Sequence, residues 1–66
     1  MKIQYFKGTD TLYIQLRPAK VNETRDLDED TLIDLDEKGS VVALTIEHAS
    51  DRTDTPKVSF EEVAGL

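Results

Sequence analysis

Apolar residues recur at every second position in several short runs of this chain, and polar turn residues separate the runs. The clearest run places Leu12, Ile14 and Leu16 on one side of an extended segment, with Tyr13 and Gln15 on the other. A period of two is the spacing of a β-strand with one buried face, whereas a helix needs apolar residues three and four positions apart. The chain therefore has to build its core from a sheet.

Five such runs follow one another, and the turns between them indicate antiparallel pairing. A polar segment with Gly8 joins the first two runs, which predicts a β-hairpin. Asp36 and Gly39 fit a type I turn that closes through a glycine in the left-handed conformation. The third run is the most polar, as expected of an edge strand. The predicted strands are residues 3–6, 11–17, 20–27, 31–35 and 41–47.

The fifth run is the most apolar, and it is apolar on both sides. Val42, Leu44 and Ile46 share one face, while Val41 and Ala43 lie on the other. A strand of this kind is usually central and covered twice. We therefore expect a second contact surface on this sheet, in the same chain or in a neighbouring one.

The C-terminal segment carries a helix-start signature. Ser59 and Glu62 have the spacing of a capping box, in which each side chain accepts a hydrogen bond from the other residue's backbone N–H. A turn so close to the end of the sequence is not stable alone, because helix nucleation is costly. We expect it to dock Phe60, Val63 and Leu66 on the second face of the sheet.

These patterns predict an α+β fold: one domain over residues 1–66, built as an antiparallel β-meander of about five strands with a short C-terminal helix. A domain of 66 residues is near the lower limit for folding alone, and the absence of cysteine excludes stabilising disulfides. A homo-oligomer or another protein partner would supply the missing buried surface.

Charge narrows the class of partner. The formal net charge of −6, with scattered Lys and Arg, opposes binding to nucleic acid and favours a basic protein partner. No apolar run has the length of a signal peptide or a membrane span, so we expect a cytoplasmic protein that does not bind membranes.

Several segments together resemble a known family. Met1-Lys2-Ile3-Gln4-Tyr5, residues 10–16, Glu23-Thr24-Arg25, residues 32–39 and residues 41–47 resemble, in order and spacing, the small bacterial domain-of-unknown-function family numbered 2283. The resemblance covers about residues 1–50. It implies a compact β-rich module and no defined activity, with a hint of an antitoxin-like role.

The residues that suggest chemistry have structural interpretations as well. Asp34 and Asp36 begin an imitation of a calcium loop, which fails because Lys38 and Thr45 stand at ligand positions. His48, the only histidine, is a candidate general base, but the chain offers it no cysteine nucleophile. We expect no cofactor and no metal, and we treat the carboxylates as a solvated face.

The sequence therefore favours a non-catalytic protein-interaction module that self-associates. The expected interface consists of Tyr13, Val41, Ala43, Phe60, Val63 and Leu66. The alternative is a small metal- or ligand-binding protein or enzyme that uses Asp34, Asp36 and His48.

Overall fold

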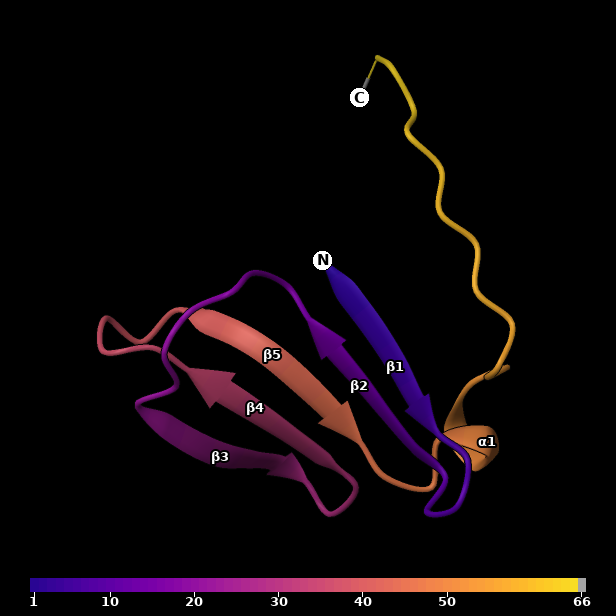
Figure 1. Cartoon of the computed structure of the whole chain (residues 1–66), viewed down its shortest axis with the longest axis horizontal. Coiled ribbons are helices and arrows are strands. Elements are labelled where there is room, and N and C mark those ends of the chain that lie inside the picture. The colour runs from indigo at the N-terminus through magenta and orange to yellow at the C-terminus, as the bar shows by residue number, and fades with distance from the viewer. Residues whose placement is uncertain (66) are drawn as a thin grey trace.

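A computed structural model describes residues 1–65, and Leu66 lies outside the described residues. The chain forms one antiparallel five-stranded sheet and one short helix (Figure 1), which confirms the expected fold class. The elements are β1 (Lys2–Phe6), β2 (Thr11–Gln15), β3 (Glu23–Asp28), β4 (Thr31–Leu35), β5 (Val41–Ile46) and α1 (Ala49–Arg52).

The strands lie in the order β1-β2-β5-β4-β3. The prediction that the fifth strand is central and the third is an edge is thus confirmed. The order differs from a simple meander, because residues 16–22 carry the chain from β2 to the far edge of the sheet. This connection is held at both ends: the Leu16 N–H donates to the Val42 carbonyl and the Asn22 N–H to the Leu35 carbonyl, each at 2.8 Å.

The two edges of the sheet differ in character. All six residues of β3 are exposed, and four of them are charged. Arg25 in this strand pairs with Glu23, with the Arg Nε 2.7 Å from a carboxylate oxygen. On the opposite edge, β1 has the sequence Lys-Ile-Gln-Tyr-Phe, in which only Lys2 is charged.

The register places apolar residues of four strands in one row. Ile3 pairs with Ile14, Ile14 with Leu44, and Leu44 with Ile33. Directly paired residues of an antiparallel sheet share a face, as do alternate residues of each strand. We call this side the apolar face, and it comprises Ile3, Tyr5, Leu12, Ile14, Thr31, Ile33, Leu35, Val42, Leu44 and Ile46.

The opposite side, the polar face, carries mainly hydrogen-bonding residues. Its two inner rows are Gln4, Tyr13, Thr45, Leu32 and Asp26, and Lys2, Gln15, Ala43, Asp34 and Thr24. The sheet is therefore strongly two-sided, as expected for an antiparallel sheet with one face turned to water.

Only the ends of the apolar face are well covered. Val42 and Ala49 have no exposed surface, and Leu35, Thr31 and Leu12 are buried. In the central row, by contrast, Ile14, Leu44 and Ile33 are only half-buried and Ile3 is 42% exposed. No second sheet or long helix lies over this row within residues 1–65 (Figure 1).

The expected helix at Ser59–Glu62 is not formed, and that prediction was wrong in position. The single helix is α1, and the chain after it extends beyond the sheet (Figure 1). Phe60 and Val63 are 83% and 73% exposed, so the segment lacks the apolar contacts that a single helical turn needs.

We predict that Val42→Ala lowers the free energy of unfolding by about 2 kcal/mol, because it removes two buried carbons and leaves a cavity beside the central strand β5. Denaturant titration of the folded chain measures this change. The control is Leu27→Ala on edge strand β3, at a side chain 64% exposed, which should cost less than about 0.5 kcal/mol. Equal losses for the two variants would contradict a core centred on Val42.

Candidate functional site

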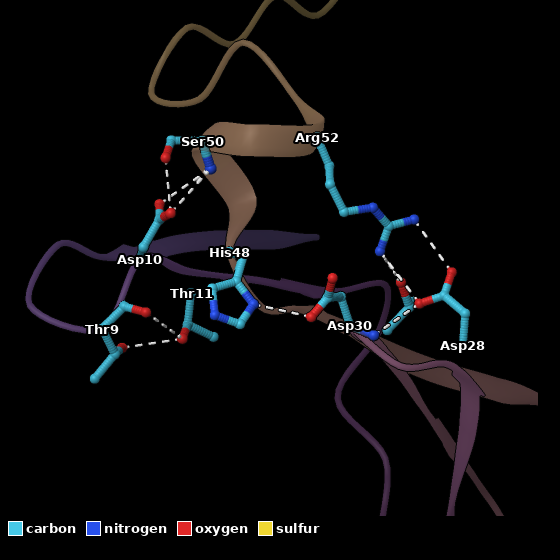
Figure 2. A network of polar contacts seen from close by, with 9 residues as sticks. Thr9, Asp10, Thr11, Asp28, Asp30, His48, Ser50 and Arg52 are labelled. Carbon is cyan, nitrogen blue, oxygen red and sulfur yellow. Dashed lines mark hydrogen bonds and ion pairs between the residues drawn. The ribbon is translucent and has the colours of Figure 1, made fainter.

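Polar side chains gather around α1, where three parts of the chain meet (Figure 2). One set of residues lies in and next to the β1–β2 turn, another in and next to the β3–β4 turn, and the third in the segment after β5. This gathering, which we call the α1 network, is the strongest candidate for chemistry because it contains the only histidine. It consists of Tyr5, Asp10, Asp28, Asp30, Thr31, His48, Ser50 and Arg52.

Asp10 fastens the start of α1 to the first hairpin. Its carboxylate accepts hydrogen bonds from the Ser50 hydroxyl at 2.7 Å and the Ser50 N–H at 3.1 Å (Figure 2). It also accepts one from the Tyr5 hydroxyl at 2.7 Å. Its carbonyl accepts from the Ala49 N–H at 2.9 Å. The bonds from Tyr5 and then Ser50 lower the pKa of the Asp10 carboxyl, because they stabilise the ionised form.

His48 joins the same region to the β3–β4 turn. Its Nδ1 lies 2.9 Å from an Asp30 carboxylate oxygen, and the Glu47 N–H donates to the Asp30 carbonyl at 2.7 Å. The hydrogen bond to Asp30 raises the pKa of His48, with the charges of Asp30, Asp51 and Glu47 acting in the same direction. The side chain is 66% exposed, so it remains accessible to water.

Arg52 completes the network from the far end of α1. Its guanidinium donates to both carboxylate oxygens of Asp28, at 3.2 and 3.1 Å, and to the Thr31 hydroxyl at 2.7 Å. The Asp28 carboxylate also accepts the Asp30 N–H at 2.9 Å. These bonds lower the pKa of Asp28, the bond from the Asp30 backbone most of all.

The geometry of the α1 network favours a structural role. Each carboxylate in it is already hydrogen-bonded, and no buried side-chain polar atom among residues 1–65 lacks a partner. Within the same residues, no three Asp, Glu or His side chains are placed to hold a metal ion. What the arrangement does is hold a helix too short to be stable alone, and with it the start of the C-terminal segment.

The structure does not bring Asp34, Asp36 and His48 together. Asp34 accepts from Thr24 across the β3–β4 pair at 2.7 Å. Asp36 lies in the β4–β5 turn, where Arg17 and the turn amides hold its pKa at about 2. His48 follows the other end of β5, and six strand residues span about 20 Å. These three side chains therefore form no common site.

The residues expected at an interface lie in two different environments. Tyr13 is half-buried on the polar face, Val41 is 37% exposed and Ala43 is completely buried. Phe60 and Val63 lie on the extended C-terminal segment and are open to solvent. The expected position of Leu66 lies outside the described residues.

Sequence reasoning missed Asp10, Ser50 and Arg52, which hold α1. Asp10 has a positive φ of 55°, a conformation that Asp adopts more readily than most residues and that fits its place in a tight turn. That turn signal is visible in the sequence. The partner of the Asp10 carboxylate, Ser50, is 40 positions away, and no local pattern points to it.

A shallow groove lies beside the α1 network, on the apolar face. It has a volume of about 320 Å³ and is bounded by Ile3, Leu12 and Ile14 on the sheet. Its other wall is the chain after α1: Thr53, Asp54, Thr55, Lys57, Val58 and Ser59. A second depression of similar volume lies between the β2–β3 connection and the β4–β5 turn, and its lining includes Lys20, Lys38, Asp36 and Glu37.

The described chain is thus a small, two-sided antiparallel sheet whose one short helix is held by a polar network. The family model described as a protein of unknown function (DUF2283) matches residues 2–50, and the chain belongs to that family. The match ends within α1, so the segment that follows lies beyond the family region. No curated protein and no solved structure shows a significant similarity to the chain.

None of the helices in the part of the chain that the structure describes has the length and apolar character needed to cross a bilayer.

We predict that Asp30→Asn returns the pKa of His48 toward its ordinary value of 6.5. Proton NMR titration measures this directly, since the single histidine gives one ring Cε1–H signal. Asp34→Asn, at the opposite end of the sheet, is the matched control and should leave the titration unchanged. A His48 pKa that is the same in the natural chain and in Asp30→Asn would show that the 2.9 Å contact is not formed in solution.

The same contact gives stability a defined pH dependence. Because the folded-state pKa of His48 is raised, the contribution of the pair is complete below pH 6.5 and is lost as pH rises through the folded pKa. The melting temperature of the natural chain should therefore decline across this window relative to that of Asp30→Asn.

Proposed function

We propose that this chain is a non-catalytic protein-interaction module that binds a second copy of itself through the apolar face of its sheet. The observation that carries the proposal is the central row of that face: four aliphatic side chains from four strands, over which residues 1–65 place no second sheet or helix.

Surface area supports self-association. The chain exposes 5275 Å², whereas a compact monomer of 7.4 kDa exposes about 4,200 Å² by the usual scaling of surface with mass. The excess of about 1,100 Å² is similar to the roughly 800 Å² that each partner buries in a standard protein interface. The extended C-terminal segment, exposed from residue 56 to residue 65, contributes to this excess, and a homodimer that covers the apolar face would remove a further part of it.

The shape of the apolar face also suits a flat contact. Ile3, Ile14, Leu44 and Ile33 form one continuous row. Polar residues border it: Arg25 pairs with Ile33 at the β3 end, and Tyr5 and Thr31 of the α1 network lie in the neighbouring row. Interfaces of stable dimers have such an apolar centre and a polar rim. Two sheets packed face to face lie about 10 Å apart with interdigitated side chains, which would complete the missing second layer.

The polar residues argue for a role without catalysis. The side chains of the α1 network are engaged with one another, and Asp34 and Asp36 lie at the opposite end of the sheet from His48. General acid–base catalysis needs groups that converge on one substrate position. The described chain offers no such convergence, which weighs against the metal-binding or enzymatic alternative.

A second candidate role is binding of a basic protein, of which an antitoxin-like neutraliser is one form. It is favoured by the net charge of −6 and by the exposed acidic β3–β4 corner, which carries Asp26, Asp28, Glu29 and Asp30. Charge of one sign speeds the approach of an oppositely charged partner.

For self-association, we expect light scattering after size exclusion to give the mass of a dimer at micromolar concentration. Ile3→Lys should raise the dimer dissociation constant at least tenfold, because it buries an unpaired charge in the contact. The matched control is Phe6→Lys, in the same edge strand but on the polar face, at a similarly exposed apolar residue. It should change the constant less than threefold.

Two results would contradict this proposal. A monomer at 100 μM would exclude self-association, and equal weakening by Ile3→Lys and Phe6→Lys would exclude the apolar face as its site. Circular dichroism of both variants verifies that the sheet remains folded.

For a basic partner, we expect the tagged chain to co-purify with the protein product of an adjoining gene, and the complex to weaken as salt is raised, because screening removes the long-range attraction. Replacing Asp26 and Glu29 by Asn and Gln should weaken the complex in the same direction. The test is immobilised-partner binding at several salt concentrations. A complex indifferent to salt and to both replacements would contradict charge-directed binding.

A further inference from the structure

We propose that the C-terminal segment, residues 57–65, is an arm that lies on the apolar face of the second copy and anchors there through Phe60. This inference rests on the proposed self-association. It adds the C-terminal segment to an interface that was argued above from the sheet alone. The arm lies beyond the family-matched region, so it is a feature of this chain rather than of that region.

The arm begins on the correct side of the sheet. Val58 and Ser59 line the groove together with Ile3, Leu12 and Ile14 of the apolar face. The start is fixed there, because the Lys57 N–H donates to the Asp54 carbonyl at 2.9 Å and Thr53 donates to the Ala49 carbonyl of α1. The α1 network thus holds the arm beside the face where a second copy would pack.

Beyond this point the arm makes few contacts with its own chain. Phe60 is 83% exposed, and none of residues 58–65 forms a hydrogen bond with another described residue. Figure 1 shows the arm continuing past the N-terminal end of β1 and ending away from the sheet. A phenylalanine so exposed, next to an aliphatic row that is also incompletely covered, indicates two surfaces that each lack a partner.

The arm cannot easily cover its own face. To do so it would have to reverse direction after Ser59, but residues 60–63 contain no Gly, Pro, Asn, Asp or Ser, the residues that favour tight turns. The arm first bends at Ala64, and the next residue, Gly65, has a positive φ of 93°. An extended chain advances about 3.3 Å per residue, so Phe60 to Val63 leads about 10 Å further outward. In Figure 1, which views the sheet face-on, the chain after α1 runs beyond the sheet rather than across it, so the arm leaves its own apolar face uncovered.

The sequence of the arm fits a one-sided contact. In an extended segment Val58 and Phe60 share one side, while Ser59 and Glu61 share the other. Val58 already borders the groove, so the side that carries Phe60 is the side turned to the apolar surface. Aromatic side chains are frequent anchors of interfaces, because they bury a large rigid surface.

The experiment measures the dimer dissociation constant by sedimentation equilibrium for the full chain and two variants. Phe60→Ala should raise the constant at least tenfold, as expected on removal of a central aromatic anchor. Glu61→Ala, the adjacent residue on the other side of the arm, should change it less than threefold. Neither residue makes a hydrogen bond in the described chain, so both variants should keep the strand signal of circular dichroism.

A cross-linking measurement identifies which copy the arm touches. A photoreactive benzoyl-phenylalanine in place of Phe60 is introduced into unlabelled chain, which is then mixed with ¹⁵N-labelled natural chain. We expect light-to-heavy cross-links that map to β1, β2 or β5. Cross-links confined to the chain that carries the probe would overturn the exchange of arms.

The outcomes separate this inference from the proposed function. A natural chain that dimerises, with Phe60→Ala dimerising equally well, overturns the arm and leaves association through the sheet in place. A natural chain that is monomeric at 100 μM overturns the proposed function and the arm together. Weakening by Phe60→Ala with light-to-heavy cross-links supports both.

Discussion

The structure depends on one constraint: a single antiparallel sheet has two faces, and this chain has enough residues to cover only the ends of the apolar one. Val42 is completely buried at one end and Ala49 at the other, while the Ile14 and Leu44 side chains between them remain half-buried. Burial of apolar surface is the main favourable term in folding and association alike. The central row is therefore the surface on which a further contact would give most stability.

The polar network near α1 serves this arrangement. Four residues cannot form a stable helix by propensity, and α1 has no side-chain cap of its own at His48. Instead, Asp10 accepts the free N–H of Ser50, and Arg52 is held by Asp28. Ionised carboxylates supply these contacts from two separate turns, so the corner where the chain leaves the sheet is fixed by long-range pairs. The geometry of that corner sets the direction in which the chain continues after residue 53.

Local patterns were sufficient to predict the strands. Alternation located all five, and the glycine at position 39, with a φ of 81°, has the left-handed conformation expected from the turn signal. The apolar character of Val41–Ile46 also predicted that this strand is central. These features depend on residues that are close together in the sequence, so the sequence alone is sufficient to predict them.

The order of the strands and the place of the helix could not be predicted in the same way. The β2–β5 pair joins residues about 30 positions apart, and alternation alone does not select it. Ser59 and Glu62 have the better helix-start pattern, yet the helix forms at Ala49. The reason is a distant contact: the Asp10 carboxylate accepts a hydrogen bond from Ser50 at the start of α1, whereas Ser59 forms no such bond. The α1 network was missed because its residues are distant in the sequence. Asp34, Asp36 and His48 were grouped because their side chains have the chemistry of a site, but they are far apart in the structure.

The unequal edges of the sheet have a consequence for how large an assembly can grow. An uncovered strand exposes backbone groups that another strand can bind, and charged residues on a strand oppose such addition. The β3 edge, exposed throughout and carrying Glu23, Arg25, Asp26 and Asp28, resists it, whereas β1 does not. Edge-to-edge pairing of two sheets is then possible only through β1, and it stops once two copies have joined. As long as the charged residues of β3 are present, the molecule cannot form an unlimited ribbon of sheets, which is the first step toward a fibril.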